Sequence, residues 1–334
     1  MPGRPIRFEF EPRPLLDIAS YARRGPGRRD HLSPAEIELI TRTVHRTPEV
    51  MVKVLTRGGQ DLGAVRRHME YLDRKGKLEI ETDDGQKLSG KGVEEELLED
   101  WDLDIEEDRR GANLEARPGR SPPKLVHKVL FSMPPGTPPK KVLEAVKNFA
   151  REEFALKHRY AMVLHTDEAH PHVHMVIKAV SEQGERLNIR KATLREWRRK
   201  FAEQLQREGI AANATERAVR GGSRTRKSDG IYRANLRGES TQINDRQKAV
   251  TSAIRSGTPE PEDGKWILRA TRRAVEAGWY AVSEILVSEG HSALANDVRR
   301  FARLMPRPMT EREQIAAKLT GRGHGLCERS PPTR

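Results

Sequence analysis

Residues 165–177 read His-Thr-Asp-Glu-Ala-His-Pro-His-Val-His-Met-Val-Ile, and four of the chain's eleven histidines fall in this stretch. Histidine is the commonest metal ligand because its neutral imidazole offers a lone pair at ordinary pH. Side chains alternate along a strand, so His172 and His174 point to the same face and can reach one ion together. The apolar, β-branched residues that follow indicate a strand. We therefore expect a metal site where this strand begins.

A second strand, expected at residues 160–165, can bring a third histidine to the pair. If the two strands form a hairpin, His165 lies beside the start of the next strand, with opposed side chains about 5 Å apart. A cation about 2.0–2.1 Å from each imidazole nitrogen fits between the three rings. His170 is two positions before His172, so its side chain could point to the same face, and it is the alternative third ligand. Pro171 and the expected turn disfavour it. The competing interpretation, a set of ordinary surface histidines, is disfavoured by their density ahead of one strand.

A tyrosine on a basic helix face is the second candidate for chemistry. The sequence predicts a helix from Asp61, a good N-cap, to about Arg74. Its apolar residues recur at helical spacing: Leu62, Val65, Met69 and Leu72. Tyr71 falls roughly opposite this stripe, and its neighbours three and four positions away are cations: Arg67, Arg74 and Lys75. A phenol is a weak nucleophile until positive charge favours the phenolate. A tyrosine among cations suits attack on a phosphodiester, although a surface tyrosine can also have cationic neighbours by chance.

The composition indicates a polyanionic partner. Lysine and arginine number 62 against 49 acidic residues, which gives a net charge of +13. A charge of this size favours nucleic acid as the partner over a neutral ligand. The single cysteine, Cys327, excludes an intramolecular disulfide and a cysteine-based zinc site, and suits a reducing compartment. No apolar run is long enough to span a bilayer or to act as a signal peptide, so we expect a cytoplasmic protein.

Shifts in composition divide the chain into four expected parts. Residues 1–47, rich in arginine, proline and glycine, are expected to form a basic, flexible N-terminal arm. Residues 48–216 carry the periodic strands and helices of the main domain, with an acidic insertion near 82–116. Residues 217–262 show little periodicity and are expected to be a basic linker, and 263–334 a small helical accessory region.

Two of these parts leave alternatives open. Ser33 and Pro34 favour a short helix within the arm, as its N-cap and first residue. The cations of the arm suit either contact with DNA phosphates or a solvated tail. Residues 94–108 read EEELLEDWDLDIEED and are expected to be a solvated amphipathic segment. The competing hypothesis is an acidic flap that shields a basic cleft.

Hydrophobic periodicity predicts the remaining elements. The expected strands are 50–55, 77–81, 125–132, 160–165 and 172–180. The expected helices are 138–156, 191–208, 266–288, 293–304 and 309–319.

Three stretches resemble one known family. The pattern His-x-Asp-x-x-His-Pro-His-x-His at 165–174 closely resembles motif III of the conjugative relaxases, the mobilisation branch of the HUH endonucleases (VirD2-like, MobP-type). The stretch HMEYLDRKGKLEIE around Tyr71 is similar to their motif I, and HKVLFSMPPGT, which contains Ser132, to motif II. The three motifs occur in the family's order and cover roughly residues 50–220.

The resemblance implies a fold and an activity. The fold is α+β, an HUH-type three-layer arrangement with a central antiparallel sheet flanked by helices. The activity is that of a metal-dependent, site- and strand-specific single-strand DNA endonuclease and transesterase. Such an enzyme nicks a transfer origin and forms a 5′-phosphotyrosyl link, which initiates conjugative transfer or mobilisation of a plasmid or integrative element.

The resemblance also implies roles for single residues. It makes Tyr71 the nucleophile and Ser132 a contact near the scissile nucleotide. Asp167 joins the catalytic group and is expected to orient a ligand by accepting from an imidazole N–H. The implied metal ligands are His165, His172 and His174. The expected DNA contacts are Arg67, Arg74, Lys75 and His170.

The implied cofactor is a divalent ion, Mg²⁺ or Mn²⁺ by expectation, with Zn²⁺ or Ni²⁺ as alternatives. The implied partner is single-stranded DNA at a transfer origin, with accessory nicking and coupling proteins as further candidates. The chain departs from the family at Lys178, where many members have asparagine, and in the long basic arm ahead of motif I.

Two other functions compete with this reading. A replication-initiator or transposase-like HUH nuclease uses similar chemistry, but such proteins usually place the tyrosine after the histidines, whereas Tyr71 precedes them. A non-catalytic DNA-binding or histidine-metal structural protein is the third hypothesis. Such a protein has no need of a tyrosine on a basic face.

Overall fold

Two units make up the described part of the chain. In this computed structural model, described residues are 16–23, 31–55, 59, 61–107, 123–223, 231, 234–235, 237–257, 262 and 264–321. The first unit contains Thr47–Ala214, and the second contains Leu16–Arg46 and Thr215–Arg334. Parts of the predicted arm, acidic insertion and linker, and Cys327, lie outside the described residues.

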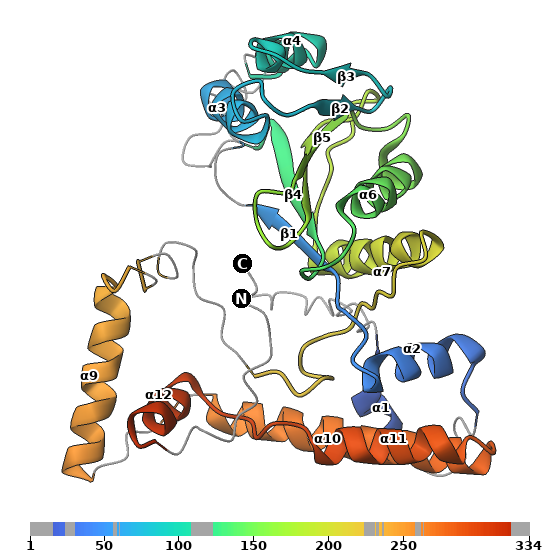
Figure 1. Cartoon of the computed structure of the whole chain (residues 1–334), viewed down its shortest axis with the longest axis vertical. Coiled ribbons are helices and arrows are strands. Elements are labelled where there is room, and N and C mark those ends of the chain that lie inside the picture. Colours follow the sequence, from blue (N-terminus) through green and yellow to red (C-terminus); the bar gives the residue numbers. More distant parts are fainter. Residues whose placement is uncertain are drawn as a thin grey trace, which may run out of the picture. The chain divides into compact units, whose positions relative to one another are not determined.

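The first unit is built on a six-stranded antiparallel sheet in the order β1-β4-β6-β5-β2-β3 (Figure 1). The strands are β1 (Met51–Leu55), β2 (Ile80–Thr82), β3 (Lys87–Leu88), β4 (Val126–Ser132), β5 (Tyr160–His165) and β6 (His172–Lys178). The central position of β6 explains its composition. Every residue of this strand is buried because both faces of the sheet are covered, and its apolar residues are Val173, Met175, Val176 and Ile177.

Two helices cover one face of the sheet: α6 (Pro139–Phe154) and α7 (Lys191–Arg207). Alternate residues of β4 and β6 point into this layer, where Phe131 and Met175 pack with Phe149, Trp197 and Phe201. The rings of Phe131 and Phe149 lie 5.0 Å apart, and Phe149 lies 6.1 Å from Trp197. This aromatic core sets the distance between the helical layer and the sheet.

The opposite face carries α3 (Leu62–Leu72) and α4 (Val93–Asp100) (Figure 1). Asp61 caps α3 by accepting a hydrogen bond from the Ala64 backbone N–H at 2.7 Å, as the sequence predicts. The apolar stripe of α3 packs with the residues of the sheet that alternate with the aromatic core. The unit therefore has three layers, and the expected α+β fold with a central antiparallel sheet is confirmed.

The second unit is helical in its described part. Its helices are α1 (Ile18–Arg23), α2 (Pro34–Val44), α9 (Thr241–Ser256), α10 (Lys265–Ser288), α11 (Ser292–Arg303) and α12 (Glu311–Leu319). α1, α2, α10 and α11 share one hydrophobic cluster. At its centre Trp279 is fully buried and donates from Nε1 to the carbonyl of Val219 at 2.9 Å.

Three segments differ from the sequence-based expectation. In the expected flexible arm, the predicted helix is confirmed as α2, with Ser33 as its N-cap and Pro34 as its first residue. The helix α1 was not expected, and apolar residues of both helices join the cluster around Trp279. The expected linker contains α9, a helix of 16 residues capped by Ser240. The acidic segment forms α4, and its apolar minority is buried against α3: Leu97, Leu98 and Trp101. In each case a few apolar residues in a charged sequence are enough to anchor a helix.

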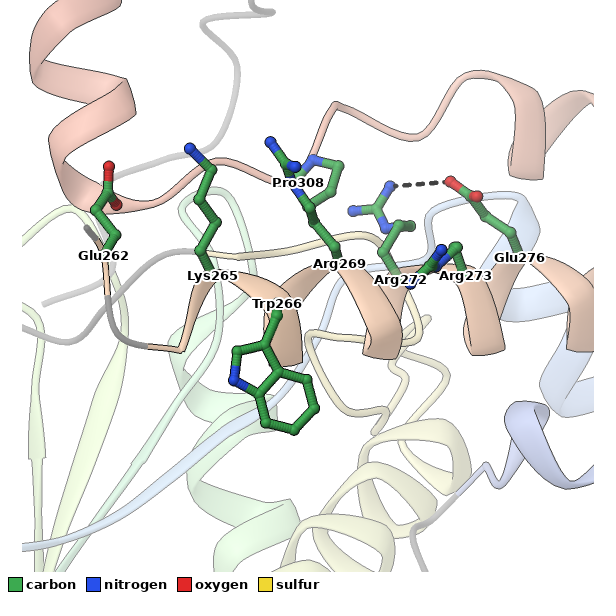
Figure 2. A pocket seen from close by; sticks show the side chains of 8 residues that line it. All are labelled: Glu262, Lys265, Trp266, Arg269, Arg272, Arg273, Glu276 and Pro308. Carbon is green, nitrogen blue, oxygen red and sulfur yellow. Dashed lines mark ion pairs between the residues drawn. The ribbon is translucent and has the colours of Figure 1, made fainter. Parts of the chain in front are cut away.

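The N-terminal half of α10 borders a hollow of about 710 Å³. Arg272 is buried there and donates to the carbonyl oxygens of Pro306 at 2.8 Å and Gly221 at 2.6 Å. It also lies 3.6 Å from a carboxylate oxygen of Glu276, the ion pair drawn in Figure 2. A buried guanidinium needs such partners, so Arg272 ties α10 to two loops of its own unit.

None of the helices in the described ranges combines the length and the hydrophobicity that a membrane span requires.

The close approach of α1 to α10 gives a test of this unit. A Cβ at Gly278 would lie 2.0 Å from the carbonyl oxygen of Ile18. Helix propensity alone predicts that Gly278→Ala stabilises α10 by about 1 kcal/mol. Because the methyl group collides with backbone, we expect instead a loss of about 1–3 kcal/mol, measured by chemical denaturation.

Ala277→Gly, on the exposed side of the same helix, is the matched control and is expected to cost about 1 kcal/mol. A gain in stability for Gly278→Ala would show that α1 does not pack on α10.

Candidate metal centre

The pairing of β5 with β6 assembles three imidazoles. His165 is directly opposite His172 in the antiparallel register, which confirms the expected hairpin. His174 follows on the same face of β6, and it is opposite Val163 on β5 and Leu130 on β4. One ring nitrogen of each histidine lies within 4.8 Å of the others. All three side chains are buried, with 1% exposure for His165 and 9% for each of the other two.

Backbone carbonyls orient two of these rings. His165 Nε2 lies 2.8 Å from the carbonyl oxygen of Leu72, and His172 Nδ1 lies 2.9 Å from that of His170. A carbonyl only accepts, so these nitrogens carry the protons. The lone pairs are then on Nδ1 of His165 and Nε2 of His172. Such outer hydrogen bonds fix the tautomer of metal-binding histidines.

Two histidines of the triad, His165 and His174, are held toward the neutral form that a metal requires. Burial, together with the neighbouring His165 and His172, lowers the pKa of His174 to about 2. Burial also lowers the pKa of His165, with a contribution from the positive charge of Arg74. Three buried imidazoles, each offering one nitrogen as a ligand atom, fit a divalent ion. His170 contributes its carbonyl oxygen to this arrangement and lies outside the cluster.

Tyr71 lies beside the triad at the end of α3. Its side chain is 54% exposed, whereas its helical neighbours Met69 and Leu72 are 1% exposed. The tyrosine is therefore on the outer side of the helix, as its spacing predicts. Leu72 also provides the carbonyl that holds His165, so consecutive residues of α3 carry the phenol and orient a candidate ligand.

Arg74 connects the tyrosine with the histidines. Its guanidinium carbon lies 4.7 Å from the centre of the Tyr71 ring. One terminal nitrogen lies 2.5 Å from Asp167 Oδ2 and 3.3 Å from Nδ1 of His165. The guanidinium has no lone pair and must donate in both contacts. It therefore shares the lone pair of His165 that would face an ion.

A tight turn places this arginine. Arg74 and Lys75 have φ values of 55° and 60°, and Gly76 follows with 81°. Residues other than glycine rarely adopt these left-handed angles, and such conformations are concentrated at functional sites. A Cβ at Gly76 would lie 2.6 Å from the backbone of Gly90, so only glycine fits the last position. The turn directs Arg74 back over the end of α3.

The other predicted site residues take different positions. Ser132 is buried at the end of β4, opposite His172, and its hydroxyl lies 3.4 Å from the Met133 carbonyl oxygen. Asp167 pairs with Arg74 and not with an imidazole N–H, which differs from the expected contact. Arg67 and Lys75 are exposed.

Two further polar residues on this face were missed by the sequence analysis. His68, three residues before Tyr71, lies with its ring centre 6.3 Å from those of both Tyr71 and His174. Lys128 is buried on β4 on the same sheet face as Ser132. Burial, together with the charge of Lys128, lowers the pKa of His68 to about 3, and burial lowers that of Lys128 to about 8. The spacing of His68 from Tyr71 was the available signal.

Comparison with known proteins finds a family that matches the part of the chain carrying this site. Residues 72–210 match the family described as relaxase, MobA/VirD2-like, nuclease domain. This segment begins one residue after Tyr71 and contains the whole histidine triad. It lies within the first unit.

Curated relatives agree with the family match. The chain is 28% identical over 200 residues to the T-DNA border endonuclease VirD2 of Rhizobium radiobacter, a match that covers 52% of this chain and 43% of the relative. It is 27% identical over 198 residues to the VirD2 protein of Agrobacterium fabrum, over 52% of this chain and 41% of the relative. The match thus spans about two fifths of these relatives' length. Residues 72–210 of this chain, which lie within the first unit, are therefore similar to the nuclease domain of the MobA/VirD2-like relaxases.

Proposed function

We propose that this chain is a metal-dependent DNA relaxase. It nicks one strand at a transfer origin and becomes linked to the new 5′ end through Tyr71, which starts transfer of a plasmid or integrative element. One observation carries the proposal: a single arginine, Arg74, contacts both an exposed tyrosine and one member of a cluster of three buried imidazoles. The match to T-DNA border endonucleases supports DNA as the substrate.

The triad would hold a divalent ion through Nδ1 of His165, Nε2 of His172 and one nitrogen of His174. An ion there supplies Lewis-acid stabilisation to the scissile phosphate. A donor set of three nitrogens favours a first-row transition ion over Mg²⁺, which prefers oxygen ligands. The remaining chemistry belongs to the side chains around the triad.

Tyr71 is the proposed nucleophile. Its phenol oxygen attacks the phosphorus, the bond from phosphorus to the 3′ oxygen breaks, and a 5′-phosphotyrosyl ester forms. The phenol loses one proton and the departing 3′ oxygen gains one, so the exchange is balanced. One phosphodiester replaces another, and the reverse reaction can therefore rejoin the strand. Exposure of the Tyr71 ring leaves it open to an incoming strand.

Arg74 has two proposed roles. Its positive charge beside the Tyr71 ring stabilises negative charge that develops on the phenol oxygen. An ion on Nδ1 of His165 would take the lone pair to which Arg74 now donates. The guanidinium would then be available to an oxygen of the scissile phosphate. Asp167, paired with Arg74 at 2.5 Å, keeps it beside the centre, and this contact replaces the imidazole contact expected for Asp167.

The DNA contacts follow from position. Ser132 lies opposite His172 at the edge of the triad. Its hydroxyl can donate a hydrogen bond to the DNA strand near the scissile nucleotide. Arg67 and Lys75 are exposed on either side of Tyr71 along the chain and suit phosphates of the single strand. His170, at the turn before β6, completes the proposed set. Accessory nicking and coupling proteins are proposed as further partners, with the reaction in the cytoplasm.

Covalent capture of DNA tests the nucleophile. The full chain is incubated with Mn²⁺ and a labelled single strand that spans the transfer origin of its own element. We expect an adduct that survives denaturation, and a loss of more than about 100-fold in Tyr71→Phe, because this change removes only the attacking oxygen.

Tyr280→Phe, an exposed tyrosine of α10, is the matched control and should keep full adduct formation. If Tyr71→Phe forms the adduct at the wild-type level, the nucleophile is another residue.

Calorimetric titration with Mn²⁺ tests the metal centre without DNA. We expect wild type to bind one ion and His174→Ala to bind it more than about 100-fold more weakly, because a direct ligand is lost. His170→Ala should bind Mn²⁺ as wild type does, since residue 170 contacts His172 through its backbone carbonyl oxygen and not through its ring. Equal loss in the two variants would contradict the assignment of His174.

A further inference from the structure

His68 is a half-buried polar residue beside the centre without a function in the reaction described above. Its ring lies edge-on to His174 and stacked against Tyr71, with 6.3 Å between ring centres in both contacts. Its Nε2 is buried and has no hydrogen-bond partner among the described residues. α3 thus places a ring with an unpartnered, buried nitrogen in contact with His174 of the triad.

Packing alone does not explain a histidine at this position. His68 is on α3, which packs on the sheet through apolar residues such as Val65 and Met69. A buried polar atom with no partner is costly, and an apolar side chain of similar size would avoid that cost. Buried polar groups are nearly always satisfied, so the partner of Nε2 is expected to be a group that joins the protein later.

The position of the ring identifies that group. The ring of His174 contacts that of His68 at 6.3 Å and those of His165 and His172 at 4.8 Å and 5.3 Å between ring centres. His68 is not one of the three residues with ligand atoms within 4.8 Å of one another. Its Nε2 therefore suits an oxygen bound to the ion on the triad better than the ion itself.

We propose that His68 is a positioning residue whose Nε2 hydrogen-bonds to the water or phosphate oxygen that completes the coordination of an ion on the triad. The inference rests on the proposed metal centre and does not require that the chain cleaves DNA. The same ring borders Tyr71, so the oxygen that His68 orients lies on the side of the centre that faces the nucleophile.

Two substitutions separate a hydrogen bond from a packing role. His68→Phe keeps a ring and removes Nε2, whereas His68→Gln loses the ring and keeps a polar atom near the position of Nε2. If Nε2 orients an oxygen on the ion, Phe should weaken Mn²⁺ binding by about 10-fold or more and Gln should retain it to within a few-fold. A packing role predicts the reverse order.

The metal-free protein gives a second readout. Since His68→Phe removes a buried unsatisfied atom, its midpoint of thermal unfolding in a chelating buffer should equal or exceed that of wild type. The expected signature is thus weaker Mn²⁺ binding without loss of stability. Calorimetry and thermal unfolding on the full chain, without DNA, measure both quantities.

His127 offers a matched control. It is a second half-buried histidine with a buried, unpartnered ring nitrogen, Nδ1. It lies on β4, and its side chain points to the sheet face opposite that of Ser132. Its Nε2 donates to the carbonyl oxygen of Leu187 at 3.1 Å. His127→Phe should therefore leave Mn²⁺ affinity unchanged.

Wild-type Mn²⁺ affinity in His68→Phe would overturn the proposal, as would an equal loss in His127→Phe. A wild-type chain that does not bind Mn²⁺ would overturn it together with the metal centre. If the Mn²⁺ affinities are as expected but no DNA adduct forms, the proposal for His68 stands and only the proposed nuclease reaction is contradicted.

Discussion

The antiparallel register of β5 and β6 is the constraint on which the centre depends. It sets His165 directly opposite His172, and the alternation along β6 adds His174 to the same face. A shift of one residue would turn every side chain of one strand to the other face. The aromatic core behind the sheet opposes such a shift, because Val173, Met175 and Ile177 would leave it. Packing on one face thus protects the geometry of the other.

The end of α3 is coupled to this register through short contacts. The carbonyl of Leu72 holds one ring of the triad, and the left-handed turn at Arg74 brings a guanidinium between the tyrosine and the histidines. Gly76 permits that turn because no Cβ fits against Gly90. The nucleophile and the metal ligands are therefore positioned by two elements that pack directly on each other, which is what a reaction at one phosphate requires.

The parts of the site that follow from periodicity were predictable from the sequence. Alternation placed His172 and His174 together, and helical spacing placed Tyr71 opposite the core stripe of α3. The partner of Asp167 was not predictable, because it depends on the left-handed turn at Arg74. His68 was missed because its position in the sequence relates it only to Tyr71. Its contact with His174 forms only when α3 packs on the sheet. The burial of α1 and α4 was also not predictable, because it depends on long-range packing of the few apolar residues in their charged sequences.

The central claim is that the three histidines form one metal site beside Tyr71, with the donor nitrogens of His165 and His172 set by backbone carbonyls. Anomalous diffraction from crystals of the chain soaked in Mn²⁺ tests this claim most directly. The account predicts one strong peak about 2.0–2.3 Å from Nδ1 of His165, Nε2 of His172 and a ring nitrogen of His174. A strong peak held by other residues, with none between these three rings, would contradict it.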